Sequence, residues 1–255
     1  MSGLGLGLGL GLGAHRIVDR YGNKPATFSI AAGFVNAGDK RINFSEPVTV
    51  TITGGVTLSI GGTVYESGDT IPVATTYHTL TINNPGEDAG TITFGKRKQI
   101  TYLYLYNLGS SVITGDITGM ELTTLVLSAM GSSSVVTGDI TDMKLTYLVL
   151  SSIGSSIITG KITGMKLTYL TLNNLGSYSV ITGDITGMKL TSLYLDRLGS
   201  SVIEGEITGM ELIRLYLNGL GSSMTYGTNS LNITNSFGIQ LLGSTVFATA
   251  AEYAQ

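Results

Sequence analysis

Hydrophobic residues recur with a fixed period between residues 100 and 217 of this chain. The pattern Leu-x-x-Leu-x-Leu, or a close variant, occurs six times, and its central leucine returns every 22 or 23 residues. A period in this range is typical of a solenoid in which each repeat forms one turn. The central leucines are Leu103, Leu125, Leu148, Leu170, Leu193 and Leu215.

Every repeat has the same internal order of residues. The alternating leucines predict a short strand whose apolar side chains point inward. An apolar residue, a glycine and serines follow, and then a second apolar stretch such as residues 112–120. A single turn cannot bury these apolar side chains, but stacked turns can. Each buried Leu or Ile contributes about 1.5–3 kcal/mol, so the repeats predict a stable core without disulfide bonds.

These repeats resemble the leucine-rich repeat family, and the resemblance covers about half of the chain. Leu-x-x-Leu-x-Leu matches the strand of that family, and Ile-Thr-Gly-Asp-Ile at residues 113–117 matches the second half of its repeat. The Thr-, Ser- and Gly-rich form is most similar to repeats in surface proteins and phage proteins of gut bacteria. The family usually has Asn or Cys where this chain has Leu108, Met130, Ile153, Leu175, Leu198 and Leu220. We therefore expect no asparagine ladder, and a turn that satisfies its own amides.

Residues 27–99 have the pattern of a small β-sandwich. Short alternating segments are separated by turn signals such as Gly54-Gly55 and Asn84-Pro85-Gly86. This region weakly resembles immunoglobulin-like or PKD-like modules, and it would cover the open first edge of the solenoid. The predicted strands are Thr27–Ile30, Arg41–Phe44, Val48–Thr53, Val56–Ile60, Thr63–Tyr65, Thr79–Asn83 and Thr91–Phe94.

Residues 1–26 form an N-terminal arm and a polar linker. Glycine and leucine alternate in the arm, which is a strand pattern with one apolar face. Glycine loses much conformational entropy on folding, so we expect the arm to be ordered by pairing with the sheet edge of a partner. The alternative is an unstructured tail. The leucines of this assembly arm are Leu4, Leu6, Leu8, Leu10 and Leu12.

At the other end, the periodic pattern weakens after Leu217. The solenoid is predicted to occupy residues 100–235, with a truncated last turn near Leu231 and Ile233. Residues 236–255 are predicted to cap it, since terminal repeats are usually atypical. The chain as a whole is therefore expected to be dominated by β-structure.

The composition excludes several kinds of function. Charged residues make up 12% of the chain, the net charge is −3 and there is no cysteine. These values argue against nucleic-acid binding, disulfides and thiolate metal sites, and no apolar stretch is long enough to insert into a membrane. The two histidines lie in different segments, and the sequence has no nucleotide-binding or nucleophile motif. We expect no enzymatic activity and no cofactor.

Two charged features have simple explanations. A column of carboxylates, formed by Asp116, Asp139, Asp184 and Glu206, is interrupted by Lys161. Calcium needs six to eight converging oxygens, so we expect a solvated face with balanced charge rather than a metal site. We also expect the basic residues 96–98 to form a solvated loop.

The outward positions of the predicted strands differ from turn to turn, whereas the inward positions hardly vary. A uniform scaffold with a varied face rich in Tyr, Asn and Ser is typical of a recognition surface. Alternatively, Tyr and Thr are simply good strand residues. The tyrosines of the predicted face are Tyr102, Tyr104, Tyr106, Tyr147, Tyr169, Tyr194 and Tyr216.

These patterns favour a structural or recognition protein of a phage virion, such as a head or tail fibre or a decoration, made in the host cytoplasm. The composition suits an exposed adhesin, yet no secretion signal is evident. The arm would bind other virion proteins, and the repeats would bind a host-surface glycan or protein. The alternative is a bacterial cell-surface adhesin with the same kind of ligand. A homo-oligomer would suit a fibre but does not follow from the residues.

Overall fold

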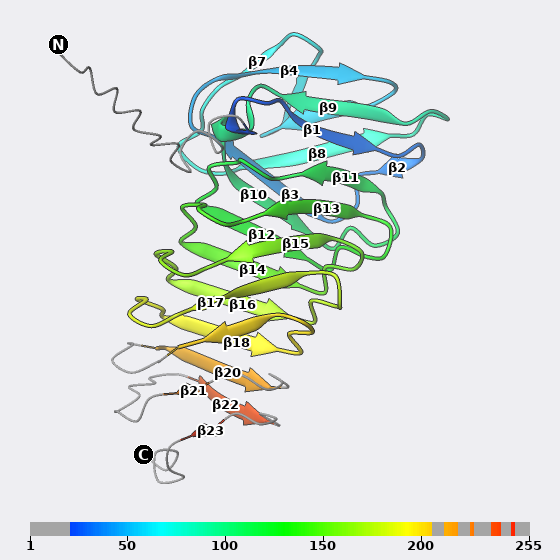
Figure 1. The fold of residues 1–255 in the computed structure, drawn as a ribbon. Helices are drawn as coiled ribbons and strands as arrows, with labels where there is room; N and C mark the ends of the chain where they lie inside the picture. The colour runs from blue at the N-terminus through cyan, green and yellow to red at the C-terminus, as the bar shows by residue number, and fades with distance from the viewer. Residues whose placement is uncertain (1–20, 206–211, 219–224, 227–235, 241–245, 248–255) are drawn as a thin grey trace, which may run out of the picture.

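The computed structural model describes residues 21–205, 212–218, 225–226, 236–240 and 246–247. It is an all-β fold with 49% strand and 3% helix. Residues 102–218 form a β-solenoid of about 5 turns, stacked below the N-terminal strands in Figure 1. The predicted all-β class and the repeat period of about 22 residues are thus confirmed.

The N-terminal strands lie close to the predicted positions. Each of the seven predicted strands agrees with an observed strand to within two residues at either end. Two strands of two residues each were not predicted, because segments so short show no alternation. The strands are β1 (Ala26–Ile30), β2 (Phe34–Val35), β3 (Asp39–Phe44), β4 (Val48–Thr53), β5 (Thr57–Ile60), β6 (Thr63–Tyr65), β7 (Thr70–Ile71), β8 (His78–Asn84) and β9 (Gly90–Phe94).

Each turn of the solenoid contributes one strand to each of two parallel sheets. We call the first the tyrosine sheet; its strands are β10 (Ile100–Tyr106), β12 (Thr124–Ser128), β14 (Tyr147–Ser151), β16 (Tyr169–Asn173), β18 (Ser192–Asp196), β20 (Arg214–Asn218) and β22 (Ser236–Gln240). We call the second the glycine sheet; its strands are β11 (Ile113–Asp116), β13 (Val135–Asp139), β15 (Ile157–Lys161), β17 (Val180–Asp184) and β19 (Val202–Glu204). A short pair, β21 (Thr225–Tyr226) and β23 (Val246–Phe247), forms a separate two-stranded sheet.

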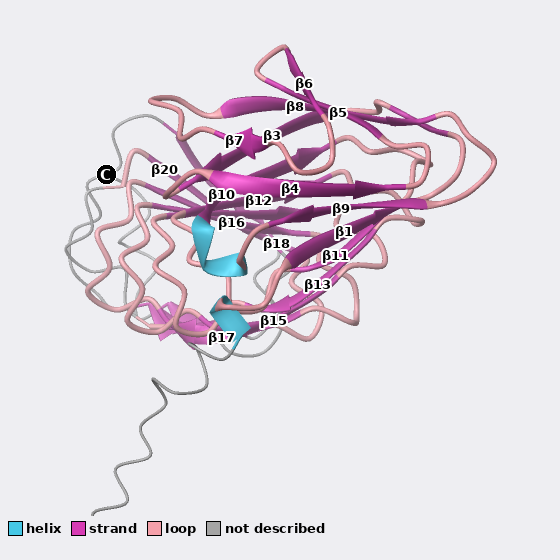
Figure 2. Cartoon of the chain, turned by 90° about the horizontal axis from the view of Figure 1, so that it is seen from above, coloured by secondary structure: helices cyan, strands magenta, loops and turns pink. Residues whose placement is uncertain are grey.

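The N-terminal strands continue both sheets of the solenoid. Strand β3 pairs antiparallel with β10, and β1 pairs antiparallel with β11. The result is a 12-stranded and a 9-stranded sheet, which form two layers around the core in Figure 2. One cluster of buried apolar residues extends from Ala26 to Leu217. The N-terminal strands therefore cover the first edge of the solenoid by hydrogen-bonded pairing.

The two sheets differ in register. In the tyrosine sheet, residues at equivalent repeat positions pair directly, as Leu103 does with Leu125. In the glycine sheet, each strand is displaced by two residues relative to the repeat, so that Thr114 pairs with Val135 rather than with its equivalent, Thr137. The same displacement occurs between all neighbouring strands from β11 to β19.

The core explains why the leucine positions hardly vary. The central leucines from Leu103 to Leu215 are at most 2% exposed. At the junction with the N-terminal strands, Phe94 packs against Phe28 and Phe44 with ring centroids 6.1 and 5.5 Å apart. A small apolar cavity beside these rings is lined only by core side chains.

One charged side chain is buried near the junction. Lys40 on β3 is 1% exposed, and its Nζ donates hydrogen bonds to the carbonyl oxygens of Ala37 and Gly38. Burial lowers the pKa of Lys40 to about 8, although the charge of Asp39 opposes this shift. The alkyl chain and the two carbonyl bonds tie the loop before β3 to the sheet.

Several predictions concern residues outside the described ranges. These are the arm leucines Leu4 to Leu12, Glu206, and the truncated turn near Leu231 and Ile233. Part of the predicted cap is described: β22 pairs in parallel with β20 and extends the tyrosine sheet by one strand.

Candidate recognition surface

Direct register arranges the outward residues of the tyrosine sheet in three columns. The first column contains Tyr102, Thr124, Tyr147, Tyr169, Ser192 and Arg214. The second contains Tyr104, Val126, Val149, Thr171, Tyr194 and Tyr216, and the third contains Tyr106, Ser128, Ser151, Asn173, Asp196 and Asn218. All seven tyrosines of the predicted face therefore lie on one side of one sheet. Most are half-buried, and Tyr106 is 44% exposed.

Neighbouring tyrosines in a column stack face to face. The rings of Tyr147 and Tyr169 are 4.3 Å apart with an interplanar angle of 11°. Tyr194 and Tyr216 form a second pair at 4.4 Å and 11°. Parallel strands bring equivalent side chains about 4.8 Å apart, so the stacking follows directly from the register. Each ring therefore packs against its partner, and all four rings are partly exposed.

The N-terminal strands add residues to this face that the sequence did not reveal. Tyr77, just before β8, stacks on Tyr102 at 5.5 Å and 13°. Arg41 on β3 lies over the rings of Tyr77 and Tyr104, at 4.5 and 5.0 Å from their centroids, and forms a 2.8 Å ion pair with Asp39. These contacts depend on the long-range pairing of β3 with β10, which no local pattern predicts.

The environment raises the pKa of four phenol groups on this face. Burial, together with the neighbouring Tyr169, raises the pKa of Tyr147 to about 12. Burial also raises the pKa of Tyr102, Tyr104 and Tyr194. A phenol is neutral at pH 7 even without such a shift, and its hydroxyl can donate and accept a hydrogen bond.

The third column is polar and partly linked by hydrogen bonds. Asn218 donates to Asp196 at 2.8 Å, and Asn173 donates to Ser151 at 3.3 Å. Asp196 is 3% exposed and also accepts from Arg197. Arg197 belongs to a series of non-glycine residues with positive φ directly after strands β10, β12, β14, β16 and β18: Asn107, Ala129, Ser152, Asn174 and Arg197.

A ladder of buried serines supports the turns behind this face. Ser156 accepts a hydrogen bond from the backbone N–H of Val136 and donates to the carbonyl of Ser134. The same pair of bonds recurs at Ser134, Ser179 and Ser201. The expectation that each turn satisfies its amides by itself is therefore wrong, because serine side chains from the neighbouring turn accept some of these N–H groups.

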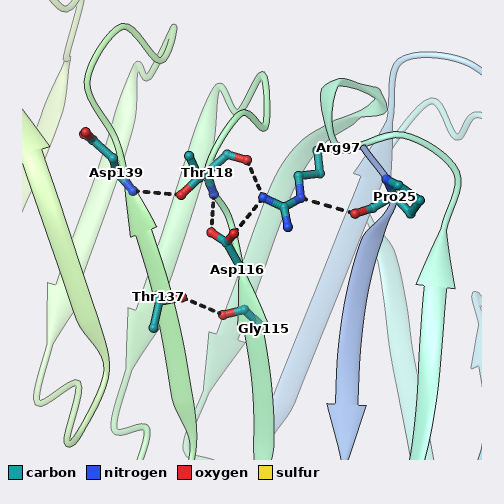
Figure 3. Close-up of polar contacts among 7 residues, drawn as sticks. All are labelled: Pro25, Arg97, Gly115, Asp116, Thr118, Thr137 and Asp139. Atoms are coloured by element: carbon teal, nitrogen blue, oxygen red, sulfur yellow. Dashed lines mark hydrogen bonds and ion pairs between the residues drawn. The ribbon is translucent and has the colours of Figure 1, made fainter. Parts of the chain in front are cut away.

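The carboxylate column has a structural role in the turns of the glycine sheet. The Oδ1 oxygen of Asp116 accepts a hydrogen bond from the backbone N–H of Thr118, two residues later in the chain. Asp139 and Asp184 accept the equivalent bonds from Thr141 and Thr186. Figure 3 shows that Arg97 joins the column: it bonds to Asp116 at 2.7 Å and to the carbonyls of Thr118 and Pro25.

One expectation is changed by these contacts. The side chain of Arg97 is 14% exposed, so the basic segment is not simply a solvated loop. Its Arg97 links the N-terminal segment to the first turn through hydrogen bonds to both. Within the described residues, no three His, Cys, Asp or Glu side chains are placed to hold a metal ion. No helix in that part of the chain is long and apolar enough to cross a membrane.

Comparison of the chain with protein-family models, curated proteins and solved structures gives no match. The architecture by itself defines the class: the chain is a β-solenoid repeat protein with a sandwich-like N-terminal cap.

Proposed function

We propose that this chain is a non-enzymatic recognition protein whose tyrosine sheet binds a glycan. The observation that carries the proposal is the set of stacked tyrosines held at fixed spacing on strands whose inner positions are leucine in all six repeats. The outer positions vary between turns while the scaffold does not, which is the arrangement expected of a surface adapted to a ligand.

The chemistry of the face favours a carbohydrate. Its aromatic rings offer apolar contact, and its phenol, serine, threonine and asparagine groups offer neutral hydrogen bonds. The ion pair of Arg41 and Asp39 adds a compact polar group beside Tyr104. A polyhydroxylated ligand lying across an open sheet can use all of these groups without a deep pocket.

Binding to immobilised hexasaccharides tests the proposal. The panel contains β-1,4-glucan, α-mannan and poly-N-acetyllactosamine hexasaccharides. We expect at least one to bind, and the double variant Tyr147→Ala/Tyr169→Ala to lose at least about tenfold in affinity, since such aromatic anchors dominate interfaces. Tyr178→Ala is the control, because Tyr178 is 70% exposed but lies in a turn outside the face. Equal loss in both variants would contradict the proposal.

We further propose that the repeats are a divergent form of the leucine-rich repeat and that the protein belongs to a phage virion. The support is the repeat pattern quoted above and its Thr-, Ser- and Gly-rich form. In this proposal the Gly-Leu arm docks on other virion proteins, and the tyrosine sheet faces the host surface. The alternative is a bacterial cell-surface adhesin that uses the same face.

Immunogold labelling of lysates from producing cells distinguishes the two settings. Antibody against residues 100–205 should label phage-like particles if the protein is part of the virion. Label on cell envelopes with unlabelled particles would reject the virion and support the adhesin.

A further inference from the structure

The stack of tyrosines in the first column is interrupted at Thr124. Tyr102 and Tyr147 lie on the two strands that flank β12, and both pair directly with Thr124 in register. Tyr102 stacks on Tyr77 from the side of the N-terminal strands, and Tyr147 stacks on Tyr169 on the far side. Among the described residues, the ring faces of Tyr102 and Tyr147 that point toward Thr124 have no aromatic partner.

The interruption has the width of one ring. Neighbouring strands are about 4.8 Å apart, so two strand spacings separate Tyr102 and Tyr147 by about 10 Å. A ring inserted midway would lie about 5 Å from each, close to the 4.3–5.5 Å separations of the stacked pairs on this face. Thr124 is half-buried and forms the floor of this position.

The surrounding groups favour a sugar ring over a purely apolar one. Tyr102, Thr124 and Tyr147 lie side by side in register on three adjacent strands, and each carries a hydroxyl that can donate and accept a hydrogen bond. The faces of a pyranose can pack on the two aromatic rings while its equatorial hydroxyls point sideways toward these groups. An aromatic side chain of a protein partner would fill the same gap but leave the hydroxyls unused.

We infer that one pyranose unit of the bound glycan inserts between Tyr102 and Tyr147. It would occupy the space above Thr124 that an aromatic side chain at this position would fill. This inference rests on the proposed glycan-binding function and identifies the subsite that would select the ligand. The remaining sugar units would extend along the tyrosine sheet.

Filling the gap with the protein's own ring tests the inference. The variant Thr124→Tyr completes the stack from Tyr77 to Tyr169, so we expect it to fold with an unchanged or higher melting temperature. Affinity for each hexasaccharide that binds the wild type should fall at least tenfold. Thr124→Val keeps the gap open and should bind within threefold of the wild type. Thr159→Tyr adds equal bulk to the glycine sheet and should also leave binding unchanged.

The outcomes separate this inference from the proposed function. If Thr124→Tyr binds like the wild type while Tyr147→Ala/Tyr169→Ala does not, the face binds glycan but the subsite is wrong. If Thr159→Tyr loses as much affinity as Thr124→Tyr, the loss is not local and the inference fails. If none of the hexasaccharides binds the wild type, both the function and the subsite are rejected. A circular dichroism spectrum of each variant verifies its fold.

Discussion

The two sheets of the solenoid are built from the same repeats but differ in the register with which neighbouring turns pair. In the tyrosine sheet equivalent residues pair directly, so side chains of one kind align in columns and can stack, as Tyr147 does on Tyr169. In the glycine sheet the strands are displaced by two residues, so the glycine of one turn pairs with an isoleucine of the next, as Gly138 does with Ile158.

Because of this difference in register, the two sheets tolerate different side chains to different degrees. A Cβ atom at Gly138 would lie 2.3 Å from Cγ1 of Ile117, so this position of the glycine sheet has no room for a side chain. The outward positions of the tyrosine sheet accept Tyr, Val, Thr, Ser and Arg over the same leucines. The glycine sheet therefore restricts its residues to those that let neighbouring turns pack, whereas the outward face of the tyrosine sheet can vary and so can be adapted for recognition.

The largest effect is expected from Gly138→Ala. The added methyl group meets Ile117 and the backbone nitrogen of Thr118, and overpacking of this kind costs about 3 kcal/mol. Thr171→Val, at an outward position of the tyrosine sheet, should change stability by less than about 0.5 kcal/mol. Urea unfolding measures both, and similar losses would show that the two sheets do not differ in tolerance.

A smaller loss is expected from Ser156→Ala in the serine ladder. The substitution leaves the buried N–H of Val136 without its acceptor, which costs about 2 kcal/mol. Ser155→Ala is the matched control, because Ser155 is exposed and bonds only to the carbonyl of Ser132. If both variants unfold at the same urea concentration, the ladder does not stabilise the turns.

Alkaline titration should report on the 12-stranded sheet. Because the pKa of Lys40 is lowered from 10.5 to about 8, the unfolded chain binds more protons between these values, and stability should rise with pH by about 3 kcal/mol. The raised pKa of Tyr147 has the opposite sign, so its contribution is lost as pH rises from 10 to about 12. Melting temperatures of Lys40→Met should lack the rise but keep the fall; a rise that persists would assign it to another group.

Acid titration should give the smallest effect and report on the glycine sheet. Burial opposes ionisation of Asp116, but hydrogen bonds from Thr118 and Arg97 outweigh it and lower its pKa. Its stabilisation is present above pH 3.8 and is lost as pH falls further. With allowance for solvent screening, we expect about 0.5 kcal/mol. Asp116→Asn should remove this part of the acid dependence, and Glu87→Gln should not.

The sequence predicted what depends on local alternation and on the period. The strands, the inward leucines and the placing of seven tyrosines on one face all follow from residues that are close in sequence. The displaced register of the glycine sheet was not predictable, because it depends on how Gly138 packs against Ile117 in the preceding turn. The contribution of Arg41 and Tyr77 to the face was missed for a similar reason, since antiparallel pairing across some 60 residues brings them there.

A ligand on the tyrosine sheet should shield the tyrosines it covers. Hydroxyl-radical labelling followed by mass spectrometry measures the solvent access of each tyrosine with and without the hexasaccharide that binds tightest. We expect protection of Tyr102, Tyr147 and Tyr169 and no change at Tyr178. Protection confined to Tyr178 or to the threonines of the glycine sheet, with the tyrosine columns labelled as before, would contradict it.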